Sequence, residues 1–277
     1  MDRIQKALDK AKAGQKANSK QSIAPAESTT NAIRAEVKSS VDIVDIAYTQ
    51  TKVVKVAEKK LADKRVIAGQ YSNPQSGVFR MLRTQVLHKM RENNWQTIAI
   101  TSPTAGEGKS LVASNLAVAM AMETNQTVLL VDLDLRNPRL SDYFSLNVEK
   151  GLKDYLEADI ELAEVLINPG VKGLVILPGK GRAENSAELL SSLKMTNLAS
   201  NLKAQYDSRM IIFDMPPILQ TDDVLLASEY IDCTLLVIED GKNKESEIVK
   251  SVQLLEGTHL IGSVLNKSEK PPMHQSY

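Results

Sequence analysis

The sequence contains few of the residues that build disulfide frameworks and metal centres. Its 277 residues include one cysteine, Cys233, and three scattered histidines. We therefore expect neither a disulfide network nor a cysteine or histidine metal site. Cys233 lies in an apolar run, which favours a buried thiol that only fills space. The formal net charge is zero, so the overall charge gives no indication of nucleic-acid binding.

Long hydrophobic runs are also missing. No apolar run approaches the roughly 18 residues of a membrane-spanning helix, and the N-terminus lacks the apolar core of a signal peptide. These absences predict a cytoplasmic chain, either free or peripheral at the inner face of the cell membrane. Because 43% of the residues are apolar, the chain is long enough to bury a large core.

The most informative segment follows the apolar run 97–100. Residues 101–110 read Thr-Ser-Pro-Thr-Ala-Gly-Glu-Gly-Lys-Ser, the pattern of a phosphate-binding loop, with proline where the first glycine is usual. The two glycines let successive N–H groups point into one concavity. The lysine would contact the terminal phosphates of ATP, and the serine hydroxyl would ligate Mg²⁺. The predicted nucleotide-binding residues of this loop are Thr104, Ala105, Gly106, Glu107, Gly108, Lys109, Ser110 and Leu111.

Two acidic motifs extend this nucleotide site into a catalytic hypothesis. One apolar run ends in Asp132 and Asp134, which share a side while the chain stays extended. A second apolar run, Met-Ile-Ile-Phe, ends in Asp214. At the carboxyl ends of parallel strands these three acids would face the phosphates. Mg²⁺ at a phosphate site needs about one or two carboxylates, so these acids and the Ser110 hydroxyl are candidates to hold a metal ion.

Apolar runs and helical patterns alternate along most of the chain. This alternation predicts an α/β fold with a mostly parallel sheet and helices on both faces. The expected strands are 97–101, 127–132, 173–177, 209–214, 233–238 and 260–265. The expected helices are 76–90, 110–123, 185–205, 222–230 and 243–256.

The chain is predicted to have four parts. Residues 1–40 would form a short helix at 2–12 and a flexible linker, and residues 41–70 an extension leading into the core. Residues 71–267 would form the ATP-binding domain, and residues 268–277 a flexible tail. The thin apolar stripe of the first helix would dock on a partner or an anionic membrane surface, or remain solvated.

Three motifs together resemble the bacterial tyrosine kinases of capsule and exopolysaccharide synthesis. They are Ser-Pro-x-x-Gly-Glu-Gly-Lys-Ser, Val-Asp-x-Asp-x-Arg-x-Pro and Asp-x-Pro-Pro. The chain is most similar to the free-standing cytoplasmic, CpsD- and CapB-like members, including those of exosortase loci. This resemblance implies a P-loop NTPase fold like that of MinD and ParA. Those partitioning relatives usually carry an extra lysine early in the loop, and Thr104 stands there instead, which favours the kinase branch.

The resemblance also implies roles for individual residues. Lys109, Asp132, Asp134 and Asp214 would be the catalytic residues, and either Asp132 or Asp134 would accept the proton of the incoming tyrosine hydroxyl. Ser110, Asp134 and Asp214 would be the ligands of the metal ion, directly or through water. Asn266, at the end of the last strand, would contact the adenine edge. A separate membrane protein that controls polysaccharide chain length would be the partner and activator. Arg136 belongs to the second motif, and a functional role and an ordinary surface ion pair explain it equally well.

The sequence departs from the family pattern at two places. Gly77 replaces the glutamate that precedes Arg80 and Arg83 in the family's ring-forming pattern, which puts a ring-shaped homo-oligomer in doubt. The alternative to a role in ring assembly is that both arginines simply lie on a solvated face of their helix. The tail contains a single tyrosine, Tyr277, where the family usually has a cluster.

These observations predict an ATP- and Mg²⁺-dependent tyrosine autokinase that regulates exopolysaccharide or capsule assembly. The main alternative is an ATPase switch that controls assembly with the membrane partner without phosphorylating tyrosine. The single tail tyrosine favours the switch, whereas the three nucleotide motifs favour the kinase. A partitioning ATPase that works on DNA is disfavoured by Thr104 and by the neutral charge.

Overall fold

The computed structural model describes residues 51–124, 126–204 and 209–269. The predicted N-terminal helix, the linker, residues 41–50 of the extension and Tyr277 lie outside the described residues. The described residues all belong to one compact unit.

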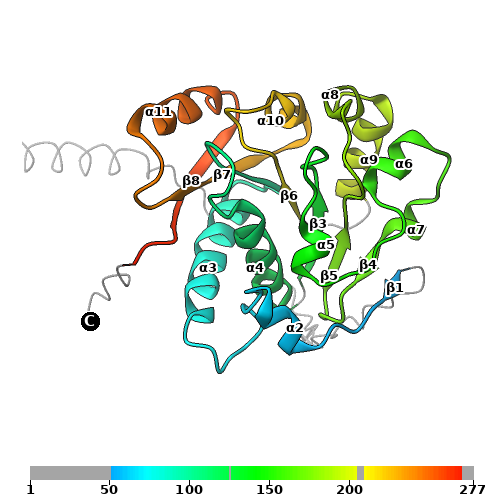
Figure 1. The fold of residues 1–277 in the computed structure, drawn as a ribbon, viewed down its shortest axis with the longest axis horizontal. Coiled ribbons are helices and arrows are strands. Elements are labelled where there is room, and N and C mark those ends of the chain that lie inside the picture. The colour runs from blue at the N-terminus through cyan, green and yellow to red at the C-terminus, as the bar shows by residue number, and fades with distance from the viewer. Residues whose placement is uncertain (1–50, 125, 205–208, 270–277) are drawn as a thin grey trace, which may run out of the picture. The chain divides into compact units, whose positions relative to one another are not determined.

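A single sheet runs through this unit, with the strand order β1-β4-β5-β3-β6-β2-β7-β8 (Figure 1). All neighbouring strands are parallel except β4 and β5, which are antiparallel. The predicted α/β class is therefore confirmed. The strands are β1 (Lys52–Val53), β2 (Thr97–Thr101), β3 (Thr127–Asp132), β4 (Ile167–Asn168), β5 (Leu174–Leu177), β6 (Arg209–Asp214), β7 (Cys233–Glu239) and β8 (His259–Asn266).

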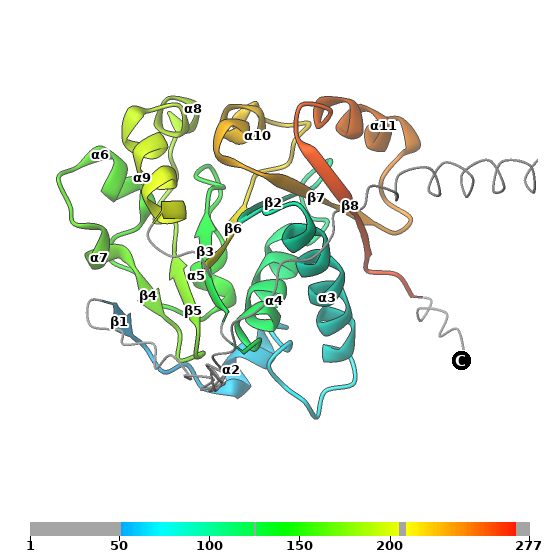
Figure 2. The same cartoon turned by 180° about the vertical axis from the view of Figure 1, so that it is seen from behind.

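Helices cover both faces of the sheet (Figures 1 and 2). One face carries α2 (Glu58–Asp63), α3 (Ser76–Glu92), α4 (Lys109–Ala121) and α5 (Leu140–Tyr143). Residues from the other helices pack in a second apolar cluster against the opposite face. These helices are α6 (Leu152–Glu157), α7 (Leu162–Val165), α8 (Ser186–Leu190), α9 (Leu193–Ala204), α10 (Asp223–Leu226), the 3₁₀ helix η1 (Ala227–Tyr230) and α11 (Glu245–Leu254).

The central strands are apolar on both sides because both sides are covered. In β3, Val128 and Leu130 belong to the cluster on the α4 face, while Leu129 and Val131 belong to the opposite cluster. This two-residue alternation is that of an extended strand. It explains why the strands read as continuous apolar runs, which is the pattern of a parallel sheet buried on both faces.

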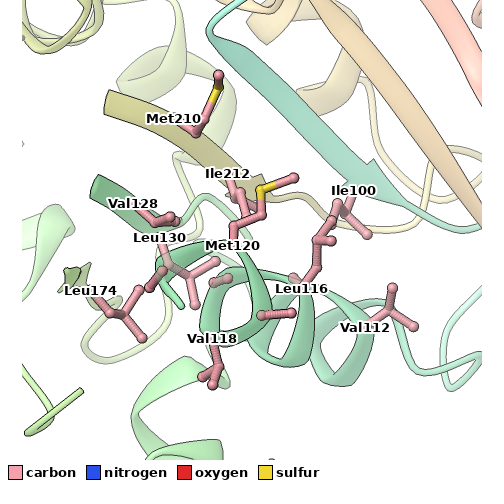
Figure 3. Close-up of a cluster of buried hydrophobic side chains, with 14 of the residues drawn as sticks. Ile100, Val112, Leu116, Val118, Met120, Val128, Leu130, Leu174, Met210 and Ile212 are labelled. Carbon is pink, nitrogen blue, oxygen red and sulfur yellow. The ribbon is translucent and has the colours of Figure 1, made fainter. Parts of the chain in front are cut away.

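Helix α4 begins in the predicted phosphate loop and is almost entirely buried. Twelve of its thirteen residues are buried, because the sheet covers one side and α3 packs on another. Figure 3 shows Leu116 and Met120 of this helix among Ile100, Leu130 and Ile212 of three strands. This packing fixes the start of the helix at the edge where the strands end.

The predicted helix 185–205 was wrong in one respect, since the chain forms two helices there. The Ser191 hydroxyl donates to the carbonyl of Ala187 at 2.8 Å, and the Ser192 hydroxyl to that of Leu189 at 2.7 Å. The Ser192 oxygen also accepts a hydrogen bond from the N–H of Met195 at 3.2 Å. Serine side chains that bond to nearby backbone compete with helical hydrogen bonds, so α8 ends here and α9 begins.

The remaining predicted strands and helices are confirmed with small shifts at their ends, and the predicted helix 222–230 is α10 followed by η1. Cys233 is buried in β7, as predicted, and burial raises the pKa of its thiol to about 12. Among the described residues, no helix is both long enough and apolar enough to cross a membrane.

Candidate active site

The candidate active site lies where the parallel strands end. The phosphate loop follows β2, and the two acidic motifs end β3 and β6, the strands next in order to β2. The register places Asp132 directly beside Asp214. Carboxyl ends of parallel strands meet at one edge of a sheet, which is where open α/β sheets bind ligands. The structure therefore brings the predicted loop and the predicted acids together.

The phosphate loop adopts the backbone that the glycines allow. Gly106 and Gly108 have φ of 95° and 94°, a region that side chains other than glycine rarely adopt. A Cβ at position 108 would lie 2.3 Å from the amide nitrogen of Asn266, so glycine is also required there for space. Gly108 caps α4 in a left-handed conformation. The first N–H groups of the helix therefore point toward an anion at the loop.

Three side chains hold the outer side of this loop through its carbonyl groups. Lys242 donates to the oxygen of Ala105 at 2.5 Å, Lys267 to that of Gly106 at 2.7 Å, and Asn266 to that of Glu107 at 2.6 Å. All three donors follow or end β7 and β8. Because the carbonyl groups are engaged outward, the peptide N–H groups of the loop are free to face a phosphate on the inner side.

The Glu107 side chain ties the loop to the segment between β7 and α11. One carboxylate oxygen accepts hydrogen bonds from Thr104 and, at 3.0 Å, from Asn243. Burial alone would raise the pKa of Glu107, but the hydrogen bonds from Thr104 and Asn243 outweigh it and hold the pKa below its usual value. Glu107 is thus an anion that braces the loop.

Lys109 is the buried cation of the site. Its Nζ lies 2.7 Å from Oδ2 of Asp134 and 3.5 Å from Oδ1 of Asp214. Burial would lower the pKa of Lys109, but the charges of Asp214 and Asp134 outweigh it and raise the pKa above its usual value. Lys109 therefore stays charged at every physiological pH, with two carboxylates as its partners.

Asp132 is held differently from the other two acids. Its Oδ2 accepts hydrogen bonds from the N–H groups of Arg139 and Leu140, both at 3.0 Å, so it holds the first turn of α5. The side chain is fully buried, and burial together with repulsion from Asp214 raises the pKa of Asp132 to about 8. Burial also raises the pKa of Asp214. Two adjacent buried carboxylates favour a shared proton.

The oxygen-rich set at this edge fits a magnesium ion that is also held by phosphates. One oxygen of Asp132 and one of Asp214 are buried with no hydrogen-bond partner, and the Ser110 hydroxyl lies 3.3 Å from Lys109 Nζ. In the part of the chain that the structure describes, no group of three acidic, histidine or cysteine side chains forms a metal cage. Mg²⁺ needs no such cage, because it usually keeps water and phosphate ligands beside one or two carboxylates.

A pocket of about 620 Å³ opens beside the loop. Five of the eight predicted loop residues line it, namely Ala105, Gly106, Gly108, Lys109 and Ser110. Asp134 also lines the pocket, whereas Asp132 and Asp214 lie buried beneath it. The segments after β3 and β6 complete the wall with residues that the sequence analysis missed, among them Arg139, Tyr143, Pro217 and Gln220.

Arg136 and Asn266 have clear structural partners. Arg136 Nε lies 3.3 Å from the buried carboxylate of Asp223, so the ion-pair explanation is confirmed, although Arg136 also lines the pocket. Asn266 lies against the loop and does not line the pocket. Its predicted contact with adenine stays a prediction.

The two arginines of α3 are not both solvated, so that alternative was wrong for Arg83. Arg83 pairs with Glu123 at 3.0 Å and donates to the carbonyl of Ala119 at 3.2 Å. It therefore fastens α3 to the end of α4. Arg80 donates to the Ser76 hydroxyl at 2.7 Å and lies over the ring of Tyr71.

Known proteins are similar to this chain in sequence. Residues 95–255 match the AAA domain family. Tyrosine-protein kinase YwqD of Bacillus subtilis is 34% identical over 201 residues, which cover 72% of this chain and 83% of that protein. The chain belongs to the bacterial tyrosine kinases. Tyrosine-protein kinase CpsD of Streptococcus agalactiae is 31% identical over 192 residues, covering 68% of this chain and 81% of that kinase.

Other bacterial tyrosine kinases are much longer than this chain. Tyrosine-protein kinase etk of Escherichia coli K12 is 33% identical over 189 residues, but these cover only 26% of its length. The chain thus spans about a quarter of the long relatives and about four fifths of the short ones. The predicted family, and the enzyme class that it implies, are confirmed.

Solved structures agree with this assignment. The kinase domain of Escherichia coli ETK has a TM-score of 0.68 at 28% identity and covers 82% of this chain and 91% of that domain. The cell-division ATPase MinD of Pyrococcus furiosus has a TM-score of 0.52 at 25% identity, covering 64% of this chain and 76% of that one. The P-loop NTPase fold, with kinases and MinD as neighbours, is therefore confirmed.

Proposed function

We propose that this bacterial tyrosine kinase transfers the γ-phosphoryl group of ATP to tyrosine hydroxyl groups during capsule or exopolysaccharide assembly. The observation that carries the proposal is the juxtaposition of the phosphate loop, Lys109 and Asp134 at one open pocket. Family membership supports the choice of tyrosine as the acceptor. Phosphoryl transfer depends mainly on positioning and charge neutralisation, which these groups provide.

Binding of ATP would change the partners of Lys109. In the structure the ammonium group contacts Asp134 at 2.7 Å. A γ-phosphate in the loop carries more negative charge than one carboxylate and would draw Lys109 toward itself. That movement would release Asp134, which faces the pocket.

Asp134 is the better placed of the two predicted proton acceptors. It lines the pocket, whereas Asp132 is fully buried and is hydrogen-bonded to the start of α5. In the proposed reaction an acceptor tyrosine enters the pocket and its oxygen attacks the γ-phosphorus. The bond from phosphorus to the leaving ADP oxygen breaks, and Asp134 takes the phenolic proton as the phenol loses electron density.

Magnesium would be held by the Ser110 hydroxyl together with Asp134 and Asp214, directly or through water. When bound, it would neutralise charge on the phosphates. The buried oxygen of Asp214 that has no hydrogen-bond partner supports this assignment.

A membrane protein that controls polysaccharide chain length would activate the kinase at the inner face of the membrane. This part of the proposal rests on the resemblance to free-standing members of the family. An ATPase switch that does not phosphorylate tyrosine is the second candidate, and the single tail tyrosine favours it.

Mass spectrometry of the full chain after incubation with ATP and Mg²⁺ tests the proposal. We expect phosphate on tyrosine in a sample that also contains the cytoplasmic segment of the membrane partner. ATP consumption with every tyrosine unmodified would support the switch instead.

A further inference from the structure

The pocket lies on one side of the phosphate loop. Its walls come from Lys64 and from the segments that follow β2, β3 and β6, and none of its lining residues follows β7 or β8. Since β7 and β8 lie on the other side of β2, the pocket opens away from Asn266, the residue predicted to contact adenine. If ATP extends from the loop toward Asn266, the pocket is left for the acceptor.

The charged side chains that line this pocket are mostly cationic. They are four cations, Lys64, Lys109, Arg136 and Arg139, and two carboxylates, Asp134 and Asp142. Three of the cations have acidic partners: Lys109 pairs with Asp134 and Asp214, Arg136 with Asp223, and Arg139 with Asp142. Lys64 has no acidic side chain within ion-pair distance among the described residues.

Lys64 reaches the pocket because the chain around it is fixed to the core. It ends α2, where the buried Leu61 anchors the helix. The next residue, Arg65, has φ of 61°, which turns the chain sharply. Asn115 of α4 then fastens residues 65–68: its Oδ1 accepts hydrogen bonds from the N–H groups of Ile67 (2.8 Å) and Ala68 (3.0 Å).

The other end of the Asn115 amide completes this attachment. Its Nδ2 donates to the carbonyl of Arg65 at 2.9 Å and to that of Leu111 at 3.0 Å. Asn115 is fully buried and belongs to the helix that begins at the phosphate loop. The extension that carries Lys64 is therefore a built wall of the pocket, held by the same helix that positions Lys109.

We infer that Lys64 is a specificity-determining residue, which selects acceptor tyrosines accompanied by a nearby carboxylate side chain. The inference rests on the proposed kinase function. A carboxylate near the acceptor tyrosine would pair with the ammonium group of Lys64, because the other cations that line the pocket already have acidic partners. Because Lys64 is exposed, the pair would add modest selectivity and would weaken with salt.

The chain itself contains tyrosines of both kinds. Tyr277 has no acidic residue closer than Glu269, whereas Tyr48 follows Asp42 and Asp45. We therefore expect the kinase to phosphorylate Tyr48, or a partner's tyrosine with similar acidic neighbours, more efficiently than Tyr277 of the tail.

A peptide assay with the full chain tests this selectivity. The acceptor is a peptide of residues 41–52, compared with the same peptide carrying Asp42→Asn and Asp45→Asn. We expect kcat/KM to be about threefold to fivefold higher for the acidic peptide, the size of one exposed ion pair, with the difference in KM. Lys64→Gln should abolish the preference and Lys64→Glu should reverse it, with KM for ATP unchanged.

Lys60→Gln is the matched control, because Lys60 is an exposed lysine of the same helix that does not line the pocket. It should keep the full preference. If the unaltered chain phosphorylates both peptides equally, the inference about Lys64 is overturned while the proposed kinase function stands. A raised KM for ATP in Lys64→Gln, equal with both peptides, would assign Lys64 to the nucleotide and also overturn it. If ATP is hydrolysed and no peptide is phosphorylated, the proposed function fails and the inference with it.

Discussion

At the scale of single residues, the site is organised around one buried cation and three buried carboxylates. Lys109 compensates Asp134 and Asp214, and Asp132 is stabilised instead by two backbone N–H groups. Buried charges are costly unless they are paired. The charges of the site are therefore balanced mainly by one another, and a bound phosphate or metal ion would compete for the same partners.

Replacing Lys109 tests its role in holding the phosphates. Lys109→Ala removes the ammonium group that lies between Asp134 and Asp214. We expect kinase activity to fall by at least about 100-fold, as when one preorganised charge stabiliser is lost, together with weaker binding of ATP measured by calorimetry. A circular dichroism spectrum would confirm that the variant is folded. Activity within a few-fold of the original chain would contradict the assignment.

The raised pKa of Asp132 predicts a particular pH dependence of stability. Its pKa of about 8 in the folded chain lies above the ordinary value of 3.8, so between these values the folded chain keeps a proton that the unfolded chain has lost. This group therefore stabilises the fold most at low pH, and its contribution is lost as pH rises through about 8. Lys109 stays charged in this window in both states.

Asp132→Asn isolates this effect, because the amide oxygen still accepts the two N–H groups of α5. In urea unfolding without nucleotide, we expect the stability of the variant relative to the original chain to rise as pH goes from about 5 to about 8. A difference that is constant across this range would show that Asp132 titrates normally.

Sequence reasoning at the residue scale found the groups whose spacing is local. The phosphate loop and the acids that end two apolar runs are contiguous motifs, and the structure brings them together. Lys64 could not be found in this way. Its place at the pocket depends on Asn115, which is 51 residues away in the sequence, and neither residue belongs to a recognisable motif.

At the scale of helices and strands, burial decides what could be predicted. The central strands are covered on both faces and read as unbroken apolar runs, so their positions were predicted well. The strands β1 and β4 have two residues each, and α5 and α7 have four each. Elements of this length have no repeat from which a periodicity can be recognised.

The attachment of the extension to α4 makes a prediction at this scale. Asn115→Ala would leave the N–H groups of Ile67 and Ala68 and the carbonyl of Arg65 without their partner. Each unsatisfied buried group costs about 1–3 kcal/mol. Ile67 and Ala68 are buried, so we expect the free energy of unfolding to fall by at least about 2 kcal/mol in urea titrations. Asn137→Ala is a suitable comparison, since that side chain faces the pocket and should affect stability little. A loss below about 0.5 kcal/mol for Asn115→Ala would show that the extension is held by other contacts.

At the scale of the whole molecule, one sheet edge gathers the phosphate loop, the pocket beside it and the wall that carries Lys64. Helix α4 connects all three, because it starts at the phosphate loop and carries Asn115. Family comparison supplied the acceptor chemistry, which this arrangement alone does not specify. The roles of Tyr277 and of residues 1–40 stay predictions.

Removal of magnesium tests the oxygen-rich site. We expect chelation by EDTA to abolish phosphoryl transfer, and restored Mg²⁺ to recover it, because the phosphates of ATP need charge neutralisation during transfer. Ser110→Ala should raise the Mg²⁺ concentration needed for half-maximal activity, whereas Ser114→Ala, a buried serine of the same helix outside the pocket, should not. Full activity in EDTA would contradict the assignment.

The most direct test of phosphoryl transfer to tyrosine follows the γ-phosphate itself. The full chain is incubated with Mg²⁺ and γ-labelled ATP, with and without the cytoplasmic segment of its membrane partner, beside a Lys109→Ala control. We expect label on tyrosine that increases in the presence of the partner segment and is absent from the Lys109→Ala control. Label released only as free phosphate, with none on protein, would contradict it.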